Sequence, residues 1–148
     1  QENLQFEHLI EDHFVVCTQQ AKMNLSLYLS SPHIGVSSRR TGLLLEDIYL
    51  NRKQLSRQIF LRCQHYATAL QVLAQYPNAI LTIPQSILKH LHYSTDLHIH
   101  ALPIELPKIR MGMYWHEHVK HNLRHQFLRT EILKIFNPDL FGRDLHIV

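Results

Sequence analysis

Strand-like and helix-like patterns of apolar residues follow one another along this chain. The strand-like patterns lie at residues 4–17, which hold two short strands, and at residues 33–37, 59–63, 79–83, 97–102 and 109–115. Helical spacing of apolar residues occurs at residues 25–29, 44–55, 65–74, 84–93 and 119–136. This order of elements predicts an α/β sheet with helices packed on its faces.

Asparagine and proline mark the ends of several predicted elements. Asn24 is a candidate N-cap of the first helix, and Pro32 ends that helix because its ring disfavours helical geometry in the preceding residue. Pro84 is expected to open a helix at its first turn. In α/β sheets, ligands bind beyond the carboxyl ends of the strands. The turns at residues 37–42, 64–66 and 82–84 are therefore the candidate binding site on physical grounds.

Composition indicates one globular domain. The chain has 148 residues, of which 45% are hydrophobic and 18% charged, and these values exclude disordered and low-complexity classes. The longest apolar runs are far shorter than the roughly 18 residues of a membrane helix, and no N-terminal run resembles a signal peptide, so a cytoplasmic location is expected. The chain begins with Gln1 rather than Met, which suggests part of a longer protein.

Charge and cysteine content give little support for a nucleic-acid or metal site. Lys and Arg number 15 against 12 Asp and Glu, an excess too small to indicate nucleic-acid binding. Cys17 and Cys63 lie in separate apolar runs, so buried free thiols are expected rather than a disulfide or a zinc site. A solvated face is the expected role of the basic residues Arg39, Arg40, Arg52, Lys53, Arg57 and Arg62, among which no aromatic residues are interleaved.

Motifs for catalysis are not found. The four glycines are scattered, so neither a phosphate loop nor a serine-nucleophile turn is present. Cys63 and His65 could pair as thiolate and base, but strand alternation places Cys63 in the core and no oxyanion site is evident. We expect no enzymatic activity, no catalytic residue and no cofactor. A titrating pair among Cys63, His65 and Ser37 would be the signature of the enzymatic alternative.

Histidine is unusually frequent, with 13 residues. His118, His121 and His125 recur at a spacing of three and four on one helical face, and imidazole is a common metal ligand. The positive charges of Lys120 and Arg124 oppose a cation there, and no nearby Cys or Asp completes a ligand set. A polar surface is therefore favoured over a metal site. His98 and His100 share one face of a strand, where partial exposure is expected, whereas Trp115 continues the predicted core stripe formed by Ile109, Met111 and Met113.

The order of these signals resembles the second half of the effector-binding domain of LysR-type bacterial transcriptional regulators, from about residue 6 to residue 136. Residues 14–17 are similar to a strand that crosses into the second subdomain, and residues 25–37 to the family's short helix, proline and strand. The series continues in order with residues 57–63, 64–76, 79–84, 102–104 and 113–116 before a final helix. The chain departs from the family pattern at residues 20–23, where His-Pro-Leu-Ala is usual, and at Gln54, where glycine is frequent.

The resemblance implies a periplasmic-binding-protein-like (type II) architecture, in which two α/β subdomains are joined by two crossing strands and hold an effector between them. Residues 18–106 would form one complete subdomain, the second. Residues 1–17 and 107–148 would supply the crossing strands, at 14–17 and 109–115, and a remnant of the first subdomain. The family's N-terminal winged helix-turn-helix, linker helix and first part of the first subdomain have no counterpart in this sequence, so this chain alone is not expected to bind an operator.

The family's effector-facing turns map onto eight residues of this sequence. These are Ser37, Ser38, Arg39, Gln64, His65, Tyr66, Thr82 and Pro84. Hydroxyl groups and backbone N–H groups at helix starts suit a carboxylate or a phenol, and the ring of Tyr66 can stack on an aromatic ligand. The alternative is that some of these residues only cap helices.

The resemblance therefore implies a ligand-sensing and oligomerisation module of a regulator, acting through a DNA-binding domain outside this chain. The implied effector is a small molecule, such as an aromatic or organic acid, and no membrane partner is expected. Apolar positions such as Leu123, Phe127 and Ile132 predict self-association. The alternative is a stand-alone small-molecule or metal-binding protein of the same fold.

Overall fold

The computed structural model describes residues 3–137 and divides the chain into two compact units. Unit 1 comprises Gln1–Glu11 and Arg110–Val148, and unit 2 comprises Asp12–Ile109. Of the expected subdomain ranges, residues 1–2 and 138–148 lie outside the described residues. The chain passes from unit 1 into unit 2 after Glu11 and returns after Ile109.

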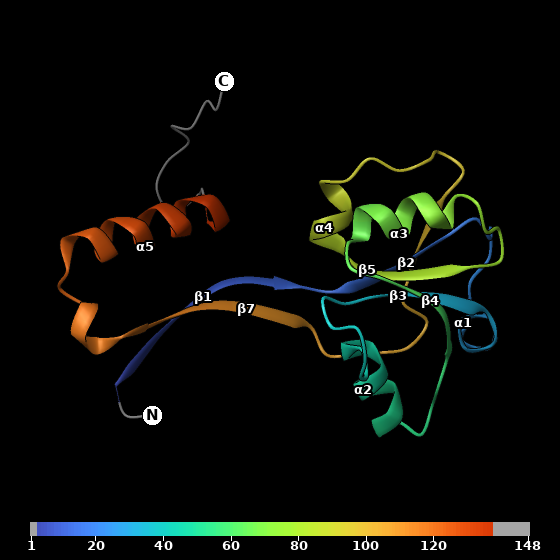
Figure 1. Cartoon of the computed structure of the whole chain (residues 1–148), viewed down its shortest axis with the longest axis horizontal. Helices are drawn as coiled ribbons and strands as arrows, with labels where there is room; N and C mark the ends of the chain where they lie inside the picture. The colour runs from blue at the N-terminus through green and yellow to red at the C-terminus, as the bar shows by residue number, and fades with distance from the viewer. Residues whose placement is uncertain (1–2, 138–148) are drawn as a thin grey trace. The chain divides into compact units, whose positions relative to one another are not determined.

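A five-stranded mixed sheet in the order β4-β3-β5-β2-β6 forms the centre of unit 2 (Figure 1). Its strands are β2 (Phe14–Thr18), β3 (Pro32–Val36), β4 (Gln58–Cys63), β5 (Ile80–Pro84) and β6 (His98–Ala101). Strand β3 pairs in parallel with β4 and β5, whereas β2 pairs antiparallel with β5 and β6. The carboxyl ends of β3, β4 and β5 therefore lie at one edge of the sheet.

Helices cover both faces of this sheet (Figure 1). They are α1 (Leu25–Ser30), α2 (Leu45–Arg52), α3 (Tyr66–Leu73) and α4 (Gln85–Lys89). Successive strand residues point to opposite faces, so Val15 and Cys17 belong to a core cluster with α3 and α4, and Val16 belongs to a second cluster with α1 and α2. The expected α/β architecture, with helices on both sides of the sheet, is confirmed for unit 2.

The ends of α1, α2 and α4 follow from local backbone bonding. Asn24 is the N-cap of α1, as predicted, and its side chain accepts from the Leu27 N–H at 2.8 Å. Pro84 was expected within the first turn of a helix, but it is the last residue of β5 and the N-cap of α4.

Helix α2 ends earlier than the sequence predicts, in a Schellman motif. The Leu55 N–H donates to the Leu50 carbonyl at 2.9 Å, and the Gln54 N–H donates to the Asn51 carbonyl at 3.0 Å. Leu50 and Leu55 pack in the same core cluster, which is the apolar contact typical of this motif. Gln54 has φ +59°, so the position where the family often has glycine is left-handed.

Strand β4 is an edge strand, and this position corrects the expectation for Cys63. The register between β3 and β4 shifts at a bulge, so Phe60 has no partner residue on β3 and its ring lies 5.4 Å from that of Tyr76. Cys63 was expected in the core but is only partly buried. Cys17 is buried as expected, and burial raises the pKa of its thiol to about 11.

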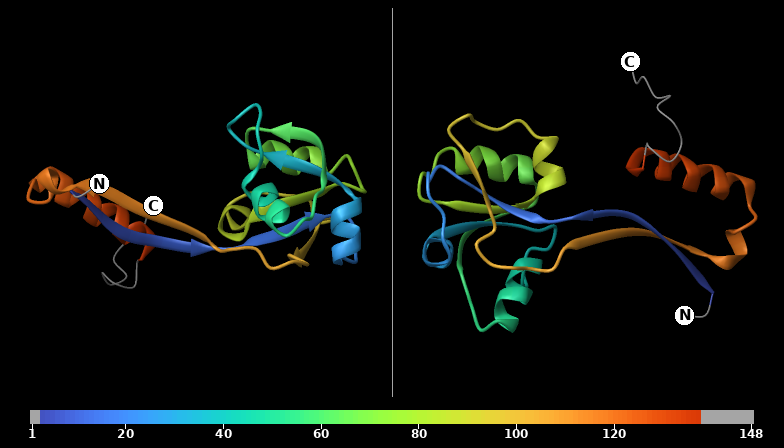
Figure 2. Two further views of the ribbon diagram at one scale, coloured as in Figure 1. Left: turned by 90° about the horizontal axis from the view of Figure 1, so that it is seen from below. Right: turned by 180° about the vertical axis from the view of Figure 1, so that it is seen from behind.

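Unit 1 contains a two-stranded sheet and a C-terminal helix (Figure 1 and Figure 2). Its elements are β1 (Leu4–Asp12), β7 (Ile109–His116), the 3-10 turn η1 (Glu117–Val119) and α5 (Leu123–Phe136). The last residue of β1, Asp12, and the first residue of β7, Ile109, are assigned to unit 2. The predicted helix from residue 119 is interrupted, because the Asn122 side chain accepts from the N–H groups of Arg124 and His125 and starts α5 anew.

The predicted core stripe on β7 is only partly buried. Met111 is 48% exposed, which contradicts the expectation for this residue. Trp115 is partly buried, and the Arg129 guanidinium lies 4.8 Å from its ring centre. Among the described residues, no helix has the length and apolar character needed to cross a membrane.

Candidate functional site

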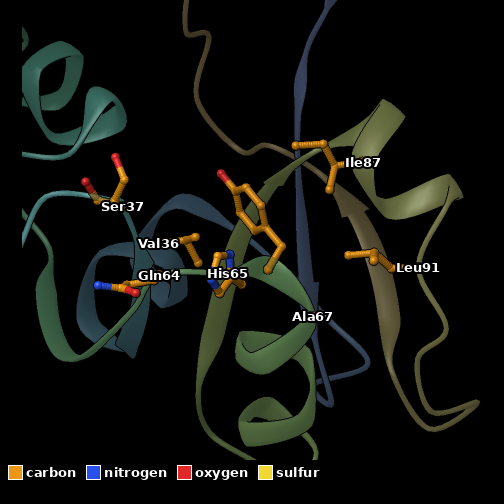
Figure 3. A pocket seen from close by; sticks show the side chains of 9 residues that line it. Val36, Ser37, Gln64, His65, Ala67, Ile87 and Leu91 are labelled. Atoms are coloured by element: carbon orange, nitrogen blue, oxygen red, sulfur yellow. The ribbon is translucent and has the colours of Figure 1, made fainter.

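A pocket of about 390 Å³ lies at the carboxyl ends of β3 and β4, beside α4 (Figure 3). Its walls come from three segments: the turn after β3, the start of α3 and helix α4 with the residues that follow it. The lining residues are Val36, Ser37, Ser38, Gln64, His65, Tyr66, Ala67, Ile87 and Leu91. The walls therefore combine hydroxyl, amide and imidazole groups with an apolar side, and they include no carboxylate, lysine or arginine.

Five of the eight predicted residues line this pocket. Ser37 and Ser38 come from the turn after β3, and the Gln64, His65 and Tyr66 segment follows β4 directly. Parallel pairing of β3 with β4 brings the two turns together, because the Ser37 N–H donates to the Cys63 carbonyl at 3.0 Å.

Two of the lining side chains bear on the helix-capping alternative. His65 is the N-cap residue of α3, yet its side chain makes no capping hydrogen bond. The Ser37 hydroxyl accepts from the Arg39 N–H at 3.1 Å, which stabilises the turn. The His65 imidazole is thus not used as a cap, whereas the Ser37 oxygen has a local structural bond and keeps its O–H as a donor.

Tyr66 lines the pocket and also packs against the core cluster of unit 2 that contains Val15 and Cys17. Burial, followed by the negative charge of Glu46, raises the pKa of its phenol, so the hydroxyl stays protonated in the neutral pH range. No hydrogen bond of this hydroxyl to another described residue is found. A protonated phenol can donate a hydrogen bond to a ligand as well as present its ring.

The apolar wall is held in place through Asp12. Ile87 lies in α4, and Leu91 is the second residue after that helix. The buried Asp12 carboxylate accepts from the Ser86 N–H at 3.3 Å and from the Ser86 hydroxyl, and the Gln85 N–H donates to the His13 carbonyl at 3.0 Å. The first turn of α4 is therefore tied to Asp12 at the end of β1 and to His13, which follows it.

Arg39, Thr82 and Pro84 do not line this pocket. Arg39 is exposed on the turn after Ser38, and Pro84 is buried at the junction of β5 and α4. Thr82 is buried in the sheet, where its hydroxyl lies 2.8 Å from the Tyr28 hydroxyl and accepts from Arg57 at 3.1 Å. Strand alternation turns Thr82 toward the face covered by α1 and α2, because Leu81 and Ile83 face α3 and α4.

Arg57 is the buried centre of an ionic network that the sequence does not reveal. Its side chain is 1% exposed, which contradicts its expected place on a solvated face. The guanidinium contacts the Asp47 carboxylate at 2.6 Å and the Glu46 carboxylate at 3.5 Å, and both acids lie in the first turn of α2. The network thus fixes α2 to the sheet without contributing to the pocket lining.

His33 completes this network as a neutral side chain. Its Nε2 lies within hydrogen-bond distance of the Tyr28 carbonyl and donates to it, whereas Nδ1 lies 3.4 Å from Arg57 and accepts. Only the neutral imidazole can do both. Burial, with a further contribution from the Arg57 charge, lowers the pKa of His33 to about 4.

The histidine-rich segment does not assemble a metal site among residues 3–137. The rings of His116 and His118 stack with centroids 4.5 Å apart. No group of three or more His, Cys, Asp or Glu side chains in this part of the chain is placed to hold a metal ion. His100 is used differently, because its Nε2 bonds to the Gln20 carbonyl at 2.9 Å, while His98 is exposed.

The fold matches solved regulatory domains of transcriptional regulators. The regulatory domain of MexT, a transcriptional activator in Pseudomonas aeruginosa, aligns with a TM-score of 0.74 at 18% identity, covering 92% of this chain and 67% of that one. CbnR, a LysR family transcriptional regulator, aligns with a TM-score of 0.59 at 10% identity, covering 90% of this chain and 48% of that one. The BenM effector-binding domain with its effector benzoate aligns with a TM-score of 0.69 at 11% identity, covering 100% of this chain and 70% of that one.

These matches define the class of the chain: it has the periplasmic-binding-protein-like fold of LysR effector-binding domains, and its pocket lies at the carboxyl ends of parallel strands. Sequence similarity to a curated protein supports the same class. The chain is 25% identical over 134 residues to the HTH-type transcriptional activator NahR of Pseudomonas putida, covering 86% of this chain and 44% of NahR.

A second curated relative gives the same result. NagR of a Ralstonia species, also an HTH-type transcriptional activator, is 23% identical over 139 residues, with coverage of 89% of this chain and 46% of NagR. No protein-family model matches the sequence. The chain is therefore related to the LysR-type regulators and spans slightly less than half the length of the curated relatives named here.

Proposed function

We propose that this chain is the ligand-sensing and oligomerisation module of a bacterial LysR-type transcriptional regulator. A small effector bound in the pocket shifts the population of conformations, and this shift controls DNA binding by a winged helix-turn-helix outside this chain. The observation that carries the proposal is the meeting of Ser37, Ser38, Gln64, His65 and Tyr66 at one pocket. The module works without catalysis or a cofactor, in the cytoplasm, where operator DNA lies.

The proposed division follows the resemblance. Residues 18–106 act as the second effector subdomain, and residues 1–17 and 107–148 supply the crossing strands and part of the first subdomain. The passages of the chain between the units, after Glu11 and after Ile109, support a division of this kind, with its first boundary a few residues earlier because β2 pairs within the sheet of unit 2. Arg39 and Pro84 are proposed as supporting residues of the strand-end turns, because Arg39 follows the lining residue Ser38 and Pro84 is the N-cap of α4, which carries the lining residue Ile87. Thr82 is proposed to support the sheet through its contacts with Tyr28 and Arg57.

The proposed effector is an aromatic or organic acid. Ile87 and Leu91 offer an apolar wall to a ring, while the hydroxyls of Ser37, Ser38 and Tyr66 can donate to a carboxylate. No lysine or arginine lines the pocket, so neutral hydrogen-bond donors would carry the recognition of the anion. Benzoate, the effector of the structural neighbour BenM, is the appropriate first probe.

Thermal unfolding in the presence of benzoate and a panel of related acids tests this site. A ligand that binds only the folded state raises the melting temperature as its concentration rises above Kd. We expect Ser37→Ala and His65→Ala to remove most of that rise, whereas the exposed controls Ser26→Ala and His125→Ala keep it. An equal rise in all four variants would exclude the pocket as the binding site.

Sequencing of the reading frame upstream of Gln1 tests the regulatory role separately. We expect it to encode a winged helix-turn-helix and a linker helix. A start codon directly before Gln1 would favour the alternative, a stand-alone small-molecule or metal-binding protein.

A further inference from the structure

Helix α4 carries part of the apolar wall of the pocket but has no capping side chain of its own. Its N-cap residue is Pro84, which makes no side-chain hydrogen bond. The first N–H groups of a helix have no acceptor within the helix, so another segment must supply one. The acceptors for α4 are Asp12 and His13, at and just after the end of β1. The position of the wall therefore depends on the end of β1.

The Asp12 carboxylate makes most of this connection. It is 7% exposed, and each of its oxygens accepts from the Ser86 N–H at 3.3 Å. Oδ2 also accepts from the Ser86 hydroxyl, and Oδ1 accepts from the His13 N–H at 2.8 Å. Among residues 3–137 these partners are neutral donors, and none is a cation. Hydrogen bonds to a charged acceptor are stronger than neutral ones, so Ser86 is held firmly.

Ser86 passes this hold directly to the pocket. The next residue, Ile87, lines the pocket, and Leu88 is buried in the core cluster that includes residues of α3. Helix α4 has five residues, so its first turn is most of its length, and a displacement of Ser86 moves the whole wall. Ile87 and Leu91 lie together on the side of the pocket away from Ser37 (Figure 3). The bonds of Ser86 therefore set the separation of the apolar wall from the polar wall.

Asp12 also acts on the polar side of the pocket, through its charge. Burial raises the pKa of the Tyr66 phenol most, and the negative charges of Glu46 and Asp12 add to this rise. The Asp12 charge thus favours the protonated phenol, which is the form that can donate to a ligand. One buried carboxylate therefore bears on both walls of the pocket, although it does not line the pocket itself.

We propose that Asp12 is a positioning residue of the pocket, and that its bonds to Ser86 make the placement of the apolar wall and the order of β1 depend on each other. Asp12 is both the last residue of β1 and the acceptor for the first turn of α4. A ligand that packs on Ile87 and favours one position of α4 also favours the β1 end that holds it. The inference rests on the proposed function for its ligand step only.

Hydrogen–deuterium exchange on the ligand-free full chain tests the connection between Asp12 and Ser86. Ser86→Ala should raise exchange at residues 8–12 by about fivefold, the effect of one hydrogen bond. In the Asp12→Asn background the same substitution should add nothing, because its acceptor is already weakened. Ser86→Thr keeps the hydroxyl and should restore wild-type exchange. Glu7→Gln, which neutralises an exposed carboxylate on β1, is the control and should leave α4 unchanged. Unchanged exchange in β1 after Ser86→Ala, or an equal effect in both backgrounds, would overturn the proposal.

Calorimetric titration with benzoate then tests the effect on the pocket. Asp12→Asn and Ser86→Ala should each raise the Kd for benzoate about fivefold, while Ser86→Thr and Glu7→Gln bind like the wild type. A carboxylate that only stabilised the fold would lower the melting temperature and leave this Kd unchanged. Equal Kd values in all variants therefore contradict the positioning role. Absence of benzoate binding by the wild type would count against the proposed effector, and the exchange experiment would still decide the role of Asp12.

Discussion

At the scale of single residues, several buried polar side chains of unit 2, among them His33, Glu46 and Thr82, depend on one cation, Arg57. Arg57 contacts two carboxylates and the hydroxyls of Tyr28 and Thr82, and it faces Nδ1 of His33. Removal of one member of such a network leaves uncompensated buried charge or polarity, which costs several kcal/mol. This explains why a histidine with no exposed surface is tolerated inside the sheet.

The pH dependence of stability should report the buried state of His33. Burial depresses its pKa to about 4 in the folded protein, below the ordinary histidine value of 6.5, so the unfolded chain binds more protons between these values. The stability it contributes is complete above about pH 6.5 and is lost as the pH falls toward 4, by about 3 kcal/mol. Urea denaturation at a series of pH values measures this slope.

The matched variant is His33→Gln, whose amide can still donate to the Tyr28 carbonyl and accept from Arg57. It should be less stable at pH 7 but should show a flatter profile between pH 6.5 and 4. Parallel pH profiles of the wild type and His33→Gln would mean that another group causes the acid sensitivity.

At the scale of elements, local bonding decides where helices start and stop. Asn24 and Asn122 begin α1 and α5 by accepting backbone N–H groups, and a Schellman motif ends α2. The apolar spacing that suggested a helix through Leu55 is explained by that motif, because Leu55 packs back on Leu50 after the helix has ended. The spacing of apolar residues therefore continues past the last residue of the helix.

Gln54→Gly should stabilise the protein. Gln54 adopts φ +59° at the end of α2, a conformation in which its Cβ crowds the following carbonyl. Glycine removes this crowding, and the gain of about 1 kcal/mol exceeds the entropy that glycine adds to the unfolded chain. Chemical denaturation measures the change, with Lys53→Gly as the control, since Lys53 has φ −94° and glycine there should be destabilising. Equal effects at both positions would contradict this explanation.

At the scale of the whole molecule, apolar burial is unevenly distributed. Every buried hydrophobic residue in the described part of the chain, from Phe14 to Leu97, belongs to unit 2. The pocket also lies wholly within unit 2. The large apolar residues that unit 1 contributes are exposed instead, among them Leu123 and Phe127.

A fragment comprising residues 12–109 should fold without unit 1. It contains the five-stranded sheet, both core clusters and the Arg57 network. We expect a cooperative thermal transition by circular dichroism, because the fragment keeps every buried hydrophobic residue of the described chain. A fragment without a cooperative transition would show that the core of unit 2 depends on contacts from the rest of the chain.

Much of the fold is encoded in local sequence patterns. The alternation of strands and helices and the Asn24 cap depend on residues close together in the chain, and the structure confirms them. The LysR resemblance, which rests on the order of those patterns, is confirmed by the relatives and the solved structures. Strand-end turns could be located in the same way, and two of the three contribute residues to the pocket. The effector role of those residues remains a prediction.

The remaining features depended on tertiary structure, because they require residues distant in the chain to meet. Strand order makes β4 an edge strand and exposes Phe60, and side-chain direction takes Thr82 away from the pocket to the Arg57 network. Arg57 is indistinguishable by sequence from its solvated basic neighbours, since only the packing of α2 on the sheet brings Glu46 and Asp47 to it. Local pattern thus determined the elements of this protein, while long-range packing decided which charges are buried and which apolar faces remain exposed.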